Sequence, residues 1–314
     1  MIIINNNSVN TAYVDLKSIQ KLILCSVNDK EFLSTHIYSI LRDICLILDE
    51  VFCCFIPDKI EIDERIKLIR NRVHLFFKKK GRNQKIYNNI IDYHISVFGD
   101  DINNIGFYMN KEEEIVGSTL YSTYILLNIE TFPLLDEEPN TKYSIFYLAK
   151  YIGEVSTFLI EFLENKYGIS PNTNINVEKI SSNPYKCWDI NHQMLFKYKS
   201  DASNSFILRL ILSLQEINDA IWIKDTYVSK LINPNFLDDY IHIRLITLKT
   251  DEIIDNLLNL RTYSKDDFEK WNNISNGRIN SLLEDFEKDI KTVCSIMRNM
   301  VHYDITSEER IKTS

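Results

Sequence analysis

Glycine and proline are both scarce in this chain of 314 residues, with 7 and 6 copies respectively. Both residues punctuate turns and strand ends, so their scarcity argues against a loop-rich or all-β protein and favours long helices. The chain is 45% hydrophobic and 25% charged, which is the ordinary range for a soluble globular protein. This length has room for one large domain or two smaller ones.

Several functional signals are also missing. The six cysteines form no CxxC pair, so we expect free thiols in a reducing compartment and a cytoplasmic protein. No run of ~18 residues is apolar and uncharged, and the first ten residues lack a basic segment. We therefore expect neither a membrane span nor a signal peptide. Glycine-rich phosphate loops, zinc-protease motifs and serine-hydrolase motifs do not occur, so we predict no metal and no cofactor.

The net charge of −8 argues against non-specific coating of nucleic acid, because proteins that do this are usually basic. One segment is an exception, since positions 65 to 85 hold nine basic residues and no acidic one. Closely spaced cations bind phosphate groups, so we predict an RNA-binding segment here. The alternative is a solvated helix end that is stabilised by the helix dipole. The residues assigned to RNA binding are Arg72, Lys78, Lys79, Lys80, Arg82 and Lys85.

The 3.6-residue periodicity of apolar side chains predicts an all-α protein built from helical bundles. The predicted helices cover 13–27, 30–56, 61–80, 84–98, 111–131, 141–167, 203–231, 236–262 and 266–303. The stretch 168–200 has no helical period, and we expect short strands within it near 175–177 and 194–198. The predicted domains are an N-terminal helical half (1–167), an irregular connection (168–200) and a C-terminal helical half (201–314).

A five-residue pattern occurs once in each predicted half. The sequence RNRVH at 70–74 and the sequence RNMVH at 298–302 are identical at four of five positions. Residues four apart share one face of a helix, so the arginine and the histidine of each copy are expected side by side. Nothing else in the chain pairs a phosphate-binding side chain with a proton-transfer side chain at fixed spacing.

This pair of side chains suits the cleavage of RNA without a metal. Arginine grips a phosphate with a fixed fork of donors, and histidine exchanges a proton near neutral pH. The histidine can deprotonate the 2′-hydroxyl or protonate the leaving 5′-oxygen, while the arginine stabilises charge on the phosphoryl oxygens. DNA lacks the 2′-hydroxyl and would resist this route.

With this motif on long helices, the chain resembles the HEPN superfamily of ribonucleases, many of which are metal-independent toxins or phage-defence effectors. The resemblance implies that two HEPN-like helical halves pack as a pseudo-dimer and that both motifs converge on one cleft. It implies histidines that act as acid and base, arginines that hold the phosphate, and asparagines that orient the phosphate or bind the nucleic-acid backbone. The spacing departs from the family, which usually leaves four to six residues between the arginine and the histidine, whereas this chain has three. The implied half-sites are Arg70, Asn71 and His74, and Arg298, Asn299 and His302.

The expected partners are RNA, a second copy of the chain that completes the site, and an antitoxin or defence-system protein. No membrane is expected as a partner. The alternative function is a non-catalytic helical interaction or RNA-binding module related to HEPN proteins. In that case the arginine and histidine of each copy pair with nearby acids inside the fold. The positions of these side chains in the folded chain therefore matter for both the nuclease hypothesis and the non-catalytic hypothesis.

Overall fold

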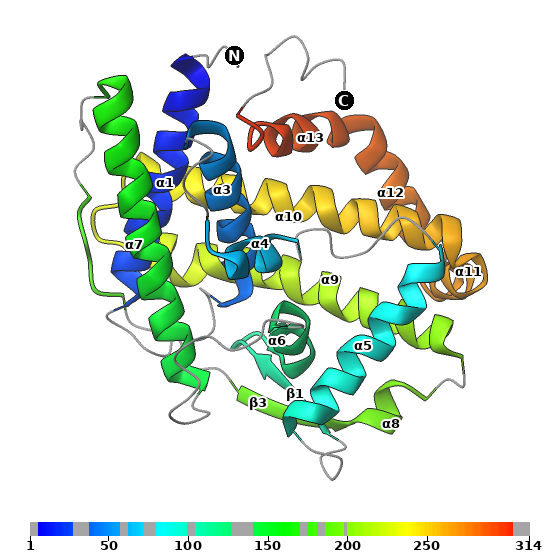
Figure 1. The fold of residues 1–314 in the computed structure, drawn as a ribbon. Helices are drawn as coiled ribbons and strands as arrows, with labels where there is room; N and C mark the ends of the chain where they lie inside the picture. The colour runs from blue at the N-terminus through cyan, green and yellow to red at the C-terminus, as the bar shows by residue number, and fades with distance from the viewer. Residues whose placement is uncertain are drawn as a thin grey trace.

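The computed structural model describes residues 6–27, 38–56, 62–71, 80–98, 104–126, 141–169, 175–180, 186–197 and 200–303. Across this part of the chain the protein is mostly helical, with 12 α-helices and one small sheet (Figure 1). The prediction of a helical protein is confirmed in this coarse form, and the sheet was not predicted. The packing of two halves as a pseudo-dimer stays a prediction. None of the described helices has an uncharged apolar stretch of the length that a membrane span requires.

The helices fall on both sides of the predicted connection. The N-terminal ones are α1 (Asn6–Ser26), α3 (Tyr38–Phe55), α4 (Glu64–Arg70), α5 (Lys80–Phe98), α6 (Thr119–Leu126) and α7 (Thr141–Tyr167). The C-terminal ones are α8 (His192–Leu195), α9 (Asp201–Thr226), α10 (Phe236–Tyr263), α11 (Lys265–Ile274), α12 (Arg278–Asp289) and α13 (Lys291–Asn299). A short 3₁₀ helix, η2 (Val228–Lys230), follows α9.

The sheet contains β1 (Asn104–Met109), β2 (Ile115–Ser118) and β3 (Lys186–Asn191), in the order β2-β1-β3 with antiparallel pairing throughout. The side chain of Asn110 accepts hydrogen bonds from the backbone of Glu112 and Glu114, and this turn joins β1 to β2. The prediction of one helix over 111–131 is therefore wrong at its start, because the turn and β2 occupy its first residues. The strands predicted near 175–177 and 194–198 are also wrong, since 175–177 is irregular and 194–195 belongs to α8. Within the described part of 168–200, the strand is β3.

The single helix predicted over 266–303 is divided into α11, α12 and α13. Asn276 and Gly277 have φ angles of 53° and 79°, a left-handed conformation that ends α11 and precedes α12. A second break at Ile290 separates α12 from α13. The apolar stripe continues across both breaks, so periodicity alone does not reveal them.

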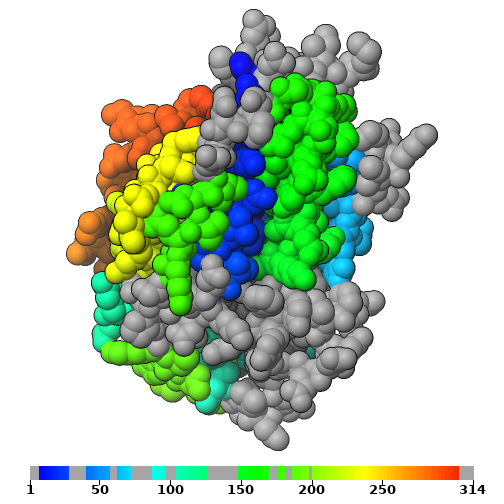
Figure 2. All heavy atoms as spheres, turned by 90° about the vertical axis from the view of Figure 1, so that its left-hand side faces the viewer, coloured from blue at the N-terminus to red at the C-terminus, as the bar shows by residue number. Residues whose placement is uncertain are grey.

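One hydrophobic core joins the two ends of the chain. It includes buried side chains from α1, α3, α7, α9 and α10, and it also contains Val301 and Tyr303, which follow α13. Figure 2 shows α1 as a strip beside α7, and α1 packs against both α7 and α10. A smaller cluster of Phe206, Leu260 and Phe268 with Leu283 holds α11 and α12 against α9 and α10. The core thus includes residues on both sides of the segment 168–200.

Charged side chains are buried where the N-terminal helices meet the C-terminal ones. Arg42 of α3 forms ion pairs with Glu216 of α9 and Glu252 of α10, and the side chains of Arg42 and Glu216 are at most 1% exposed. Lys249 of α10 lies 3.0 Å from Asp43 of α3, and both are equally buried. A buried charge is costly without its partner, so these pairs fix α3 against α9 and α10.

We predict that Arg42→Met destabilises the protein, because it leaves the carboxylate of Glu216 buried without its counter-charge. The free energy of unfolding in urea should fall by about 3–5 kcal/mol. Lys150→Met is the matched control, since its cation in α7 is 62% exposed and its pair with Glu154 contributes little. Equal stability of the two variants would contradict this account of the helix packing.

Candidate functional site

Arg70 is the last residue of α4 and contacts the second half of α3. The side chain of Asp63 caps the start of α4, and Ile66 and Ile69 bury one face of this short helix. This packing directs Arg70 to two adjacent carboxylates of α3. Its Nη2 donates a hydrogen bond to Oε1 of Glu50, and its Nε lies 3.2 Å from Oδ2 of Asp49 as an ion pair.

His302 approaches the same carboxylate from the other end of the chain. Nδ1 of His302 lies 3.0 Å from Oε2 of Glu50, within hydrogen-bond distance. The residues on either side of it, Val301 and Tyr303, are buried, whereas the His302 side chain is 38% exposed. The segment after α13 therefore anchors itself in the core and presents the imidazole at the surface.

Glu50 thus joins the two copies of the sequence pattern. One carboxylate oxygen accepts from Arg70 of the first copy, and the other faces His302 of the second copy. The guanidinium of Arg70 and the imidazole of His302 therefore contact the same carboxylate. We call Arg70, Glu50 and His302 the bridged triad.

The lowered pKa of Glu50 indicates which nitrogen of His302 carries a proton. Burial disfavours the charged form of Glu50, but hydrogen bonds from His302 and Arg70 outweigh this, so the pKa of Glu50 is lowered from its ordinary value of 4.5. An ionised carboxylate only accepts hydrogen bonds, so Nδ1 of His302 must be the donor. In the neutral imidazole the lone pair then resides on Nε2, which is the nitrogen that can act as a base.

Asp49 differs from its neighbour Glu50. Burial raises the pKa of Asp49, and Arg70 offsets this only in part. The thiol of Cys53 lies 3.9 Å from the same carboxylate, and burial raises the pKa of that thiol. Asp49 is therefore a weaker counter-ion for Arg70 than Glu50 is.

Arg298 of the second copy is held by α10. Its Nη1 lies 2.8 Å from Oδ2 of Asp251 and 3.6 Å from Oδ2 of Asp255, and its side chain is 30% exposed. Ser295 donates a further hydrogen bond to Asp251 at 3.1 Å. These contacts pair Arg298 with carboxylates and attach α13 to α10.

The two asparagines of the pattern each lie at a helix end. Asn71 caps the C-terminus of α4, donates its backbone N–H to the carbonyl of Lys67 and has an exposed side chain. Asn299 is the last residue of α13 and is half-buried, and its carbonyl accepts the backbone N–H of His302. Both are within four residues of the triad in sequence.

For the remaining predicted site residues, the structure describes no side-chain positions. His74, Arg72, Lys78 and Lys79 lie outside the described residues, so the expected approach of His74 to Arg70 stays a prediction. The other three basic residues lie in the first turns of α5, whose side chains are not described at those positions. These are Lys80, Arg82 and Lys85.

Glu50 was not predicted from the sequence. The available signal was the pair Asp49-Glu50 near the end of a helix that is otherwise largely apolar, because buried carboxylates are rare without a partner. Another histidine, His94, is buried and lies 3.0 Å from the hydroxyl of Thr119, and burial lowers its pKa. Among the described residues, no group of three or more histidine, cysteine, aspartate or glutamate side chains is arranged to hold a metal.

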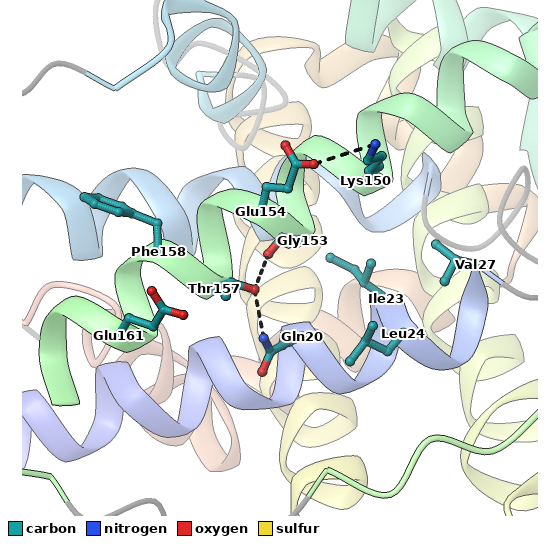
Figure 3. A pocket seen from close by; sticks show the side chains of 10 residues that line it. All are labelled: Gln20, Ile23, Leu24, Val27, Lys150, Gly153, Glu154, Thr157, Phe158 and Glu161. Atoms are coloured by element: carbon teal, nitrogen blue, oxygen red, sulfur yellow. Dashed lines mark hydrogen bonds and ion pairs between the residues drawn. The ribbon is translucent and has the colours of Figure 1, made fainter.

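A groove of about 580 Å³ lies elsewhere on the surface, between α1 and α7 (Figure 3). Ile23, Leu24 and Phe158 provide apolar walls, and a hydrogen bond of 2.9 Å from Gln20 to Thr157 crosses between the helices. None of the residues in the predicted site lines this groove. Its lining contains neither a histidine nor an arginine, so it lacks the groups that the RNA-cleavage chemistry requires.

Comparisons with protein-family models, with curated proteins and with solved structures found no match to this chain. Functional inference therefore rests on the geometry of the site and on the sequence motif.

We predict that His302→Ala raises the pKa of Glu50 toward 4.5, because one of its two charge-stabilising hydrogen bonds is removed. The measurement is a ¹³C NMR titration of glutamate carboxyl groups, in which Glu50→Gln identifies the resonance. His242→Ala should leave that resonance unchanged, because the charged groups that act on His242 are Lys224, Asp225 and Asp239 and do not include Glu50. An unaltered Glu50 pKa in His302→Ala would contradict the geometry of the triad.

The lowered pKa of Glu50 also predicts the sign of a pH effect on stability. The folded protein binds this proton more weakly than the unfolded chain, so Glu50 contributes stability above its ordinary pKa of 4.5. That contribution is lost as the pH falls through the lowered folded value. In urea unfolding, the difference in the free energy of unfolding between wild type and Glu50→Gln should shrink as the pH falls through this range. The exposed change Glu284→Gln is the control, and an equal pH response would be the contrary result.

Proposed function

We propose that this protein is a metal-independent RNA endonuclease of the HEPN type, acting in the cytoplasm as a toxin or phage-defence effector. The observation that carries the proposal is the bridged triad. A phosphate-binding side chain and a proton-transfer side chain, one from each copy of the motif, meet on one carboxylate at a partly exposed position. This arrangement supplies the two functions that cleavage by the 2′-hydroxyl requires.

The proposed mechanism assigns one role to each group of the triad. Nε2 of His302 takes the proton from the 2′-hydroxyl as that oxygen forms a bond to phosphorus. Glu50 holds Nδ1–H, fixes the ring orientation and stabilises the imidazolium that forms, as an orienting carboxylate does in hydrolase triads. Arg70 stabilises the charge that develops on the non-bridging oxygens. The bond from phosphorus to the 5′-oxygen breaks, and His74, in its protonated form, is proposed to donate a proton to this leaving oxygen.

The other motif residues have supporting roles in the proposal. Arg298 provides a second contact to the RNA backbone, beside its pairs with α10, and Asn71 and Asn299 orient the strand. The basic segment around α4 and α5 draws phosphates to the site of this net-acidic protein. RNA is thus the main partner. A second copy of the chain and an antitoxin or defence-system protein are the further partners proposed.

A second function is favoured by one specific observation. The guanidinium groups of Arg70 and Arg298 are both paired with carboxylates, namely those of α3 and α10. Such pairs can serve to hold a fold together without any reaction. Under this alternative the chain is a non-catalytic helical module that binds RNA or another protein.

The deciding experiment is cleavage of a mixed RNA pool in the presence of EDTA. We predict cleavage by wild type, and a loss of about 10²–10⁴-fold in both His302→Ala and Arg70→Ala, because each removes one group of the reaction. Arg298→Ala should reduce cleavage less, since its guanidinium is engaged by two acids. The exposed Arg278→Ala is the matched control and should cleave as wild type does.

A second substrate separates this mechanism from other nuclease reactions. A 2′-deoxy nucleotide at the scissile position should abolish cleavage, because the attacking oxygen is absent. Failure of folded wild type to cleave RNA, combined with retained RNA binding, would overturn the nuclease proposal in favour of the binding module. Unchanged cleavage in His302→Ala would move the reaction away from the triad.

A further inference from the structure

A second buried network lies behind His302. Asp15, in the middle of α1, is fully buried and accepts hydrogen bonds from three side chains of the C-terminal part. The hydroxyl of Tyr303 donates to Oδ2 at 2.7 Å, and the hydroxyl of Tyr240 donates to Oδ1 at 2.9 Å. Arg244 donates from Nε and Nη2 at 3.1 and 3.0 Å. One carboxylate of α1 therefore gathers donors from α10 and from the segment after α13.

This network holds the chain on both sides of His302. Tyr303 follows His302 directly, and its hydroxyl is fixed by Asp15. On the other side, Nη1 of Arg244 donates to the carbonyl of Met297 in the last turn of α13. Carbonyls in the last turn of a helix lack intrahelical partners, so this contact also caps α13. The short turn that carries His302 is thus held by a hydrogen bond before it, at Met297, and by another after it, at Tyr303.

The pinned turn is also placed against α3. The rings of Tyr303 and Phe55 have centroids 5.8 Å apart with a tilt of 48°, and Glu50 precedes Phe55 on the same helix. His302 contacts Glu50 while its neighbour contacts Asp15. The imidazole is therefore held between an anchor on α1 and a partner on α3.

A hydroxyl at position 303 does more than fill the core. A phenyl ring would occupy the same buried space without a polar group that needs a partner. The Asp15–Arg244 pair already joins α1 to α10. The hydrogen bond from the Tyr303 hydroxyl additionally attaches the segment after α13 to this pair. Burial raises the pKa of Tyr303, and Asp15 raises it further, so the hydroxyl keeps its proton and remains a donor.

We propose that Asp15, acting through Tyr303, is a positioning residue that holds His302 against Glu50. The effect on RNA cleavage rests on the proposed nuclease function, whereas the effect on the His302–Glu50 contact does not. Without the hydrogen bond to Glu50, the tautomer of His302 is no longer fixed, and its ring is no longer oriented toward the 2′-hydroxyl. Displacement of a catalytic group by about 1 Å is enough to lower a rate by roughly 10²-fold.

The test compares Tyr303→Phe with Tyr240→Phe. Both variants remove one hydroxyl that bonds to Asp15, and both retain the ring, but only Tyr303 is adjacent to His302. The first readout is the Glu50 carboxyl titration by ¹³C NMR, with the fold of each variant checked by circular dichroism. We expect the Glu50 pKa to rise toward 4.5 in Tyr303→Phe and to remain at the wild-type value in Tyr240→Phe.

The second readout is RNA cleavage. Tyr303→Phe should lower kcat by about 10–100-fold with little change in KM, since phosphate binding by Arg70 is retained, and Tyr240→Phe should keep the wild-type kcat. A Glu50 pKa that moves equally in both variants, in neither, or only in Tyr240→Phe would overturn the proposal. If Glu50 responds as expected but wild type cleaves no RNA, the positioning role stands and the proposed nuclease function fails.

Discussion

Ion pairs buried between helices that are distant in sequence determine how this chain is arranged. Arg42 and Asp43 of α3 meet acids and a lysine of α9 and α10, and Asp15 of α1 meets Arg244 of α10. Each of these charges would be costly to bury alone. The observed arrangement, which brings α1 and α3 onto α9 and α10, satisfies all of them together. The pairs therefore specify which surfaces meet, whereas the surrounding apolar core supplies the main driving force for burial.

The candidate site depends on the same arrangement. The first half of α3 is fixed by its buried pairs, and the second half presents Asp49 and Glu50 to Arg70. The Asp15 network brings the segment after α13 to the same side of the molecule, so that His302 reaches Glu50. Two segments at opposite ends of the sequence thereby meet at one carboxylate. The nuclease proposal needs this meeting, because it brings one residue from each copy of the motif to the same carboxylate.

Local patterns in the sequence predicted much of the helical structure. The bounds of α7 agree with the predicted 141–167, and those of α10 differ from the predicted helix by one residue. The start of α10 has a local cause, since Asn235 and Asp238 form a capping box. The hairpin of β1 and β2 and the breaks within 266–303 were missed. Side-chain turns and left-handed residues produce these features while the apolar period continues.

The partners of the motif residues were less predictable than the helices. The repeated pattern identified Arg70, Arg298 and His302, but helical spacing says nothing about contacts between distant segments. It could not show that Glu50 would join two of them, or that Asp251 would pair with Arg298. A carboxylate in a largely apolar helix indicates that it has a partner in the fold, but it does not indicate which residue that partner is. Contacts of this kind follow from tertiary packing alone.

The most direct test of the central claim is a double-variant cycle on RNA cleavage with Arg70→Ala, His302→Ala and the combined variant. Groups that act as one unit show strongly non-additive losses. If the two copies of the motif form a single site at Glu50, the double variant should cleave about as slowly as the weaker single variant. Losses that multiply would show that Arg70 and His302 act independently and would contradict a shared site.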